Sequence, residues 1–186
     1  GKLLAYISSD AGKRSVWVRQ LATGKSVPIL AATEDTVIGI GFSRDGEYLQ
    51  YLHKPRDGSP QLSKMPVLGG APIKMLDGFH SGVNFSPDER RIAFVRMAKA
   101  ESALIVTNAD GTNEKALITY PRPFSIAGLA WSPDGNEIGY SVTKISSGGK
   151  ESRPARIAVD GGTEQSVTDF RWNYLEGMMW LPDGTG

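Results

Sequence analysis

The sequence has no cysteine and only two histidines, so it lacks most of the side chains that metal and catalytic sites use. Without cysteine there is no disulfide, no thiolate metal ligand and no cysteine nucleophile. His53 and His80 lie far apart and neither has a neighbouring carboxylate motif, so we expect no metal site and no catalytic triad. The Gly-x-Ser-x-Gly motif of many hydrolases is also missing. The sequence therefore predicts a chain with no catalytic residue, no metal and no cofactor.

An excess of charge of one sign and a long apolar run are missing too. The chain has 21 Lys and Arg against 20 Asp and Glu, a formal net charge of +1, which does not resemble the basic surface of a nucleic-acid binder. No apolar run approaches the roughly 20 residues that cross a bilayer. We expect no nucleic-acid partner and no membrane contact from this segment. Because Gly1 leads directly into a strand-like run, we also expect the chain to be part of a larger protein.

Turn residues, in contrast, are abundant, with 22 glycines and 11 prolines, and they recur in a repeat. An aromatic residue is followed three positions later by aspartate in FSRDG, FSPDE, WSPDG and WLPDG. By subtraction, the aromatics Phe42, Phe85, Trp131 and Trp180 are 43, 46 and 49 residues apart. Spacing of this size is typical of one propeller blade per repeat.

The aspartates of these motifs are predicted to stabilise turns. Serine, proline, aspartate and glycine in succession favour a type I turn, in which the aspartate bonds nearby backbone. Recurrence of one carboxylate per repeat favours this structural role over a catalytic one. The predicted turn residues are Asp45, Asp88, Asp134 and Asp183.

Each repeat is predicted to contain four antiparallel strands. An apolar, β-prone run follows each turn, and a third strand after it ends in a pair such as Asp110-Gly111 or Gly161-Gly162, which favours a tight hairpin. No long helical pattern with caps is present. The sequence thus predicts an all-β fold, a β-propeller of four-stranded blades in one domain over 1–186. The expected inner strands lie near 36–43, 82–86, 126–132 and 176–181.

Four repeats leave three arrangements open. They form a closed four-blade ring, in which 176–181 supplies the inner strand that the first repeat lacks, or part of a larger propeller, or half of an eight-blade homodimer.

The repeats resemble the WD40-like propeller repeats of the TolB type, whose consensus runs aromatic-Ser-Pro-Asp-Gly and then an Ile-Ala-Phe-like strand. FSPDERRIAFVR at 85–96 and WSPDGNEIGYSV at 131–142 carry the resemblance, which covers nearly the whole chain. It implies extracytoplasmic, periplasmic scaffolding, a sensor-like region, or the substrate-gating propeller of a prolyl-oligopeptidase-like peptidase.

The loops between repeats are the candidate binding sites, because loops on a rigid scaffold commonly carry function. Two of them, TYPRPFS at 119–125 and DFRWNYLE at 169–176, are rich in aromatic residues and arginine, the residue types enriched in binding hot spots. An alternative is that some of these aromatics fill the space between blades. The predicted binding residues are Tyr120, Arg122, Phe124, Arg171, Trp172 and Tyr174.

These observations predict a non-enzymatic propeller that binds a protein, peptide or small ligand, as a sensor-like part of a larger protein. The alternative is an accessory propeller of a prolyl-oligopeptidase-like peptidase or a carbohydrate-active enzyme whose catalytic domain lies outside this chain.

Overall fold

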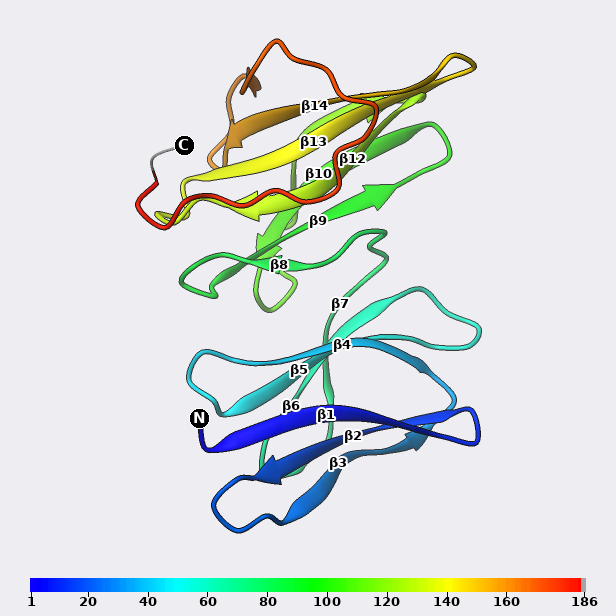
Figure 1. Cartoon of the computed structure of the whole chain (residues 1–186), viewed down its shortest axis with the longest axis vertical. Coiled ribbons are helices and arrows are strands. Elements are labelled where there is room, and N and C mark those ends of the chain that lie inside the picture. Colours follow the sequence, from blue (N-terminus) through cyan, green and yellow to red (C-terminus); the bar gives the residue numbers. More distant parts are fainter. Residues whose placement is uncertain (185–186) are drawn as a thin grey trace. The chain divides into compact units, whose positions relative to one another are not determined.

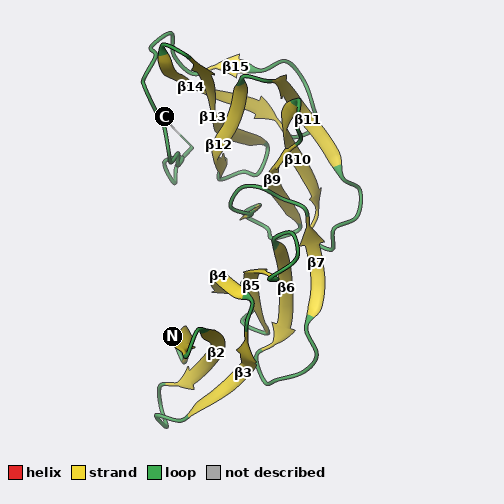
Figure 2. Cartoon of the chain, turned by 90° about the vertical axis from the view of Figure 1, so that its right-hand side faces the viewer, coloured by secondary structure: helices red, strands yellow, loops and turns green. Residues whose placement is uncertain are grey.

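The computed structural model describes residues 1–184, and all of its regular structure is β-strand (Figure 1). Strands and connecting loops account for every described residue in Figure 2, so the all-β prediction is confirmed. The described chain contains no helix that is long and apolar enough to cross a membrane. It divides into two compact units, residues 1–78 and the described residues from 79 onward, which are described separately.

The first unit begins with a three-stranded antiparallel sheet. Its strands are β1 (Leu3–Asp10), β2 (Lys13–Gln20) and β3 (Ser26–Thr33), in that spatial order. The β1–β2 hairpin turns through Ala11 and Gly12, which both have positive φ, a conformation typical of tight hairpins.

A four-stranded sheet completes this unit. It consists of β4 (Thr36–Phe42), β5 (Tyr48–Lys54), β6 (Gln61–Pro66) and β7 (Ile73–Asp77), each paired with the next along the chain. The two sheets share one hydrophobic core, whose buried members are Val16, Val18, Val37, Leu49, Tyr51, Met65 and Val67. Alternation along β5 puts Leu49 and Tyr51 on the face that packs against the β1–β2–β3 sheet.

The second unit has two sheets of the same plan. The first contains β8 (Asn84–Phe85), β9 (Arg91–Met97), β10 (Glu101–Asn108) and β11 (Lys115–Pro121). The second contains β12 (Phe124–Trp131), β13 (Glu137–Ser146), β14 (Gly149–Ala158) and β15 (Gln165–Ser166).

Both apolar packing and polar contacts join these two sheets. Residues of β9 and β10 form a buried core with residues of β12, β13 and β14. Trp131 Nε1 donates to the carbonyl of Asn84 at 3.0 Å, and the Arg91 guanidinium lies 5.2 Å from the Trp131 ring centre. Arg91 also donates to the carbonyl of Gly135 at 2.8 Å. The aromatic residue that marks the repeat thus bonds one inner strand to the inner strand before it.

Residues 176–181, expected as a fourth inner strand, do not form a strand in the structure, because no neighbouring strand pairs with them within residues 1–184. They nevertheless lie beside β12 and β13. Trp180 Nε1 donates to the carbonyl of Ala130 at 3.0 Å, and Ser141 Oγ donates to the carbonyl of Leu175 at 3.4 Å. The division into two compact units does not test whether residues 1–186 form a single domain, so that statement stays a prediction.

Candidate functional site

The loop that follows β15 returns along the β13–β14 hairpin and is held there by backbone pairing. Ser152 N donates to the carbonyl of Trp172 at 2.6 Å, and Trp172 N donates to the carbonyl of Ser152 at 2.9 Å. The Ser152 side chain is buried and its hydroxyl lies 2.8 Å from that of Thr143 on β13. This single bridge fixes the middle of the loop on a regular sheet.

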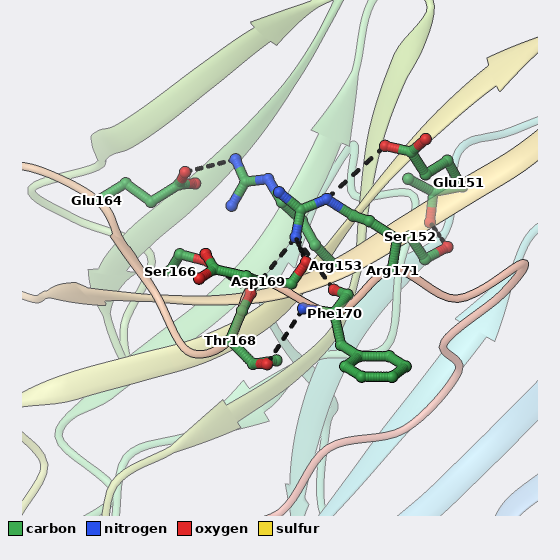
Figure 3. Close-up of polar contacts among 10 residues, drawn as sticks. Glu151, Ser152, Arg153, Glu164, Ser166, Thr168, Asp169, Phe170 and Arg171 are labelled. Carbon is green, nitrogen blue, oxygen red and sulfur yellow. Dashed lines mark hydrogen bonds and ion pairs between the residues drawn. The ribbon is translucent and has the colours of Figure 1, made fainter.

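Arg171, one of the predicted binding residues, folds back on its own loop. Its Nη1 donates to the carbonyls of Asp169 and Phe170 at 3.0 Å each and to that of Thr168 at 3.4 Å (Figure 3). Its Nε lies 3.7 Å from the carboxylate of Glu151 on β14. The guanidinium therefore donates to three carbonyls of its own tight loop. These hydrogen bonds stabilise the conformation of the loop.

The aromatic side chains of this loop face solvent. Phe170, Trp172 and Tyr174 are 69%, 39% and 50% exposed, and the first two rings lie 5.6 Å apart. Lys150 Nζ, at the start of β14, lies 4.6 Å from the centre of the Tyr174 ring. A shallow hollow beside Tyr174 is lined by Gly148, Gly149, Lys150 and Asn173. We call Lys150, Phe170, Trp172 and Tyr174 the aromatic loop surface.

The other predicted loop lies at the opposite edge of the same hairpin. Ile145 N on β13 donates to the carbonyl of Pro123, and the bond between Arg122 and Pro123 is cis. Arg122 is exposed, whereas Tyr120 and Phe124 are partly buried against the hydrophobic core, with their rings 5.9 Å apart. The structure thus brings Arg171, Trp172 and Tyr174 together on one loop and places Tyr120 and Phe124 in packing positions.

Tyr120 also belongs to a partly buried polar cluster around Glu164. The carboxylate accepts hydrogen bonds from Tyr120, from Tyr140 Oη at 2.8 Å and from Arg153 Nη2 at 2.5 Å. Burial raises the pKa of the Tyr140 phenol to about 12 and also raises the pKa of Glu164. Because Tyr120 lies on β11 and the other residues on or after β13, the cluster ties one sheet to the next.

The repeat aspartates lie in tight turns of the structure. In three copies a serine hydroxyl donates to the carboxylate two residues later, at 2.5 Å for Asp45 and 2.6 Å for Asp88 and Asp134. The N–H two residues beyond each aspartate donates to the same oxygen. These bonds, the serine hydroxyl first, hold the pKa of each carboxyl below its usual value. At Asp183 the turn closes through Gly184 N and the carbonyl of Leu181, 2.9 Å apart.

The sequence reasoning missed one chain of polar residues in the first unit. His53 Nδ1 lies 3.0 Å from Asp35 Oδ2, and His53 Nε2 lies 3.2 Å from Ser63 Oγ. No short motif signals this arrangement, because cross-strand pairing of β5 with β6 and the loop before β4 bring the three residues together. Ser63 is only 4% exposed, so the hydroxyl that accepts or donates this bond is enclosed within the unit. Of residues 1–184, no group of three or more His, Cys, Asp or Glu is placed to hold a metal ion.

The chain was compared with protein families, with proteins of similar sequence and with solved structures. No family model matches the chain. A segment of 51 residues is 49% identical to the Tol-Pal system protein TolB of Nitrosomonas europaea, which covers 27% of this chain and 12% of that protein.

Solved structures match much more of the chain. TolB from Acinetobacter baumannii superposes with a TM-score of 0.65 at 13% identity, over 98% of this chain and 45% of the other. An oligogalacturonate lyase gives 0.70 at 17% identity, over 97% and 54%. The propeller domain of the trilobed protease of Pyrococcus furiosus gives 0.64 at 14% identity, over 90% and 54%.

The chain therefore spans about half the length, or less, of these solved neighbours, and at such identities the likeness describes the fold alone. Together with the repeated sheets and the TolB segment match, it shows that the chain has a TolB-like β-propeller fold.

Proposed function

We propose that this chain is a non-enzymatic, sensor-like binding region of a larger bacterial protein, and that it recognises a protein or peptide through the aromatic loop surface. The observation that carries the proposal is the exposure of Phe170, Trp172 and Tyr174 on a loop fixed to a regular sheet. Rigid aromatic rings provide contact area at low cost in conformational entropy, and they are enriched in binding hot spots. Arg122, at the opposite edge of the same hairpin, is exposed but is not part of this surface.

Two further observations support a protein partner and a compartment outside the cytoplasm. The match to a Tol-Pal system protein relates the chain to a named multi-protein system. The TolB-type resemblance implies the periplasm.

The proposal is tested by selecting peptides from a displayed random library on the purified chain. Peptides selected on the unaltered chain should lose most of their affinity for a Trp172→Ala, Tyr174→Ala double variant, measured by titration calorimetry. Tyr48→Ala is the matched control, because Lys64 Nζ lies 4.8 Å from the Tyr48 ring centre, much as Lys150 lies over Tyr174. Equal affinity for the double variant and the control would refute the proposed surface.

The second candidate is an accessory propeller of a peptidase or carbohydrate-active enzyme. It is favoured by the similarity to a protease propeller domain and to a lyase. It requires that the aromatic loop surface face a catalytic domain of the same protein. A hydrolase or lyase domain encoded next to this segment, and protection of Trp172 from solvent quenchers in the longer protein, would support it.

A further inference from the structure

The backbone acceptors of the loop that carries the aromatic loop surface are largely used by the chain itself. The carbonyls of residues 168–170 accept hydrogen bonds from Arg171. The N–H and the carbonyl of Trp172 are both paired with Ser152. A partner that binds here therefore meets mainly the exposed side chains of the loop.

The polar side-chain groups that have no hydrogen-bonding partner within residues 1–184 are rich in donors. They are the indole N–H of Trp172, the side-chain amide of Asn173 and the phenol of Tyr174. Lys150 makes no ion pair with any residue of the same range, and its ammonium lies 4.6 Å from the Tyr174 ring centre. Indole and ammonium groups can only donate, and an amide and a phenol can each donate as well. These groups favour a ligand that has many acceptors and few donors.

Exposed rings lie next to these donors. The rings of Phe170 and Trp172 are 5.6 Å apart and tilted by 40° to each other. Phe170 is 69% exposed, and its ring points away from the polar contacts of Arg171 (Figure 3). The surface thus offers an apolar face with hydrogen-bond donors and one cation at its edge.

Two common types of ligand match this pattern poorly. A peptide that adds as a strand needs alternating donors and acceptors from a free backbone edge, but the backbone of Trp172 is already paired with β14. A saccharide brings a donor with each hydroxyl and needs free acceptors, whereas the carbonyls of residues 168–170 are occupied.

A polyproline II segment matches the pattern well. Proline has no backbone N–H, so a run of prolines brings carbonyl acceptors without matching donors. The polyproline II helix has no internal hydrogen bonds, which leaves these carbonyls free for donors on a partner. Proline-rich segments also bind aromatic surfaces, because their conformation is formed before binding and little entropy is lost.

We propose, building on the function proposed above, that the partner of the aromatic loop surface is a proline-rich segment that carries an acidic residue. Its proline rings pack against Phe170 and Trp172, and its carbonyls accept hydrogen bonds from the Trp172 indole and the Tyr174 phenol. Its acidic side chain pairs with Lys150, the cation that has no ion pair within residues 1–184. The hydrogen bonds of Arg171 hold the loop in place before binding, which lowers the entropy cost.

Two synthetic peptides of equal length test the class of ligand. The first is a run of prolines with one glutamate at each end, and the second keeps both glutamates but replaces the prolines with alternating glycine and serine. Titration calorimetry with the unaltered chain should give an affinity about tenfold higher for the proline peptide. Equal affinities, or no binding of the proline peptide at millimolar concentration, would overturn the proposal.

Trp172→Phe tests the indole donor separately from the ring. The variant keeps an aromatic ring and removes the N–H, so the proline peptide should bind roughly three- to tenfold more weakly. Trp17→Phe is the matched control, because Trp17 Nε1 already donates to Ser15 Oγ at 2.9 Å, and it should bind as the unaltered chain does. The same affinity in both variants would contradict the proposed hydrogen bond.

Lys150→Ala tests the acidic residue of the partner. The variant should bind the glutamate-flanked proline peptide about threefold more weakly, and a peptide with glutamine in place of glutamate should not distinguish it from the unaltered chain. Lys64→Ala is the control, because Lys64 Nζ lies 4.8 Å from the Tyr48 ring centre in a similar contact of the first unit. Equal binding of the glutamate peptide by the two variants would refute the ion pair.

The peptide library described above distinguishes a wrong partner class from a wrong surface. Selected peptides that need Trp172 and Tyr174 but are not enriched in proline would refute the proline-rich partner and leave the proposed function in place. Selected peptides that need neither residue would refute both. Binding of cellohexaose that is lost in Trp172→Ala, without binding of the proline peptide, would assign the surface to a saccharide instead and overturn the proposal.

Discussion

Single polar side chains of the second unit form hydrogen bonds that connect its neighbouring sheets. Glu164 lies after β14, yet its carboxylate accepts hydrogen bonds from residues on β11, β13 and β14. A partly buried carboxylate of this kind stabilises a fold only while its donors remain in place, because a donor without an acceptor carries a desolvation cost. The packing of Tyr120 also shows how an aromatic residue in a loop-like sequence can have a structural role.

Replacing Glu164 with alanine should lower the free energy of unfolding by about 2 kcal/mol, because Tyr140 and Arg153 lose their acceptor. Urea unfolding measures the change. The control is Glu114→Ala, which removes an ion pair with Arg96 in which both side chains are 37% exposed; it should cost less than about 1 kcal/mol. Equal losses in the two variants would show that the Glu164 cluster is no more than a surface contact.

Tyr140 provides a test by pH. Burial raises the pKa of the Tyr140 phenol to about 12 from its ordinary value of 10.0, so the folded state holds the phenolic proton more tightly than the unfolded state. Its contribution to stability is full below pH 10.0 and decreases as the pH rises toward about 12. Stability measured across this range should therefore decrease less in Tyr140→Phe than in the unaltered chain. A parallel decrease in both would contradict the assignment.

At the scale of elements, the turns and hairpins could be predicted from the sequence because their signals are local. Ser132, Asp134 and Gly135 determine a turn through contacts within a few residues, and β12 lies close to the expected 126–132. Contacts made by pairing over long distances could not be predicted this way. The His53, Asp35 and Ser63 chain depends on strand register, and no pattern within any one segment reveals it.

The same difference between local and long-range contacts determines how much of the candidate site could be predicted from the sequence. The composition of 169–176 favoured a binding loop, with packing of its aromatics between blades as the alternative, and in the structure Trp172 and Tyr174 are 39% and 50% exposed. The inward direction of Tyr120 could not be predicted, because it depends on Glu164, 44 positions away. The binding role of both loops stays a prediction.

The closest backbone approach between 176–181 and β12 depends on a glycine. Gly128 of β12 has a φ of +63°, and an added Cβ would lie 2.8 Å from the carbonyl oxygen of Glu176. Gly128→Ala should therefore lower the free energy of unfolding by about 1–3 kcal/mol and shift Trp180 fluorescence toward that of an exposed indole. Gly41→Ala in β4, where no atom lies within 4 Å of the added Cβ, should change stability by less than about 0.5 kcal/mol. Unchanged Trp180 fluorescence in Gly128→Ala would show that the segment does not depend on this approach.

For the whole molecule, the charge is nearly balanced, and the proposed recognition therefore relies on exposed apolar side chains rather than on a charged surface. The aromatic loop surface meets that description, because its exposed rings stand on a loop that is already paired with β14. A loop fixed in this way loses little conformational entropy on binding, so it suits a partner of different sequence.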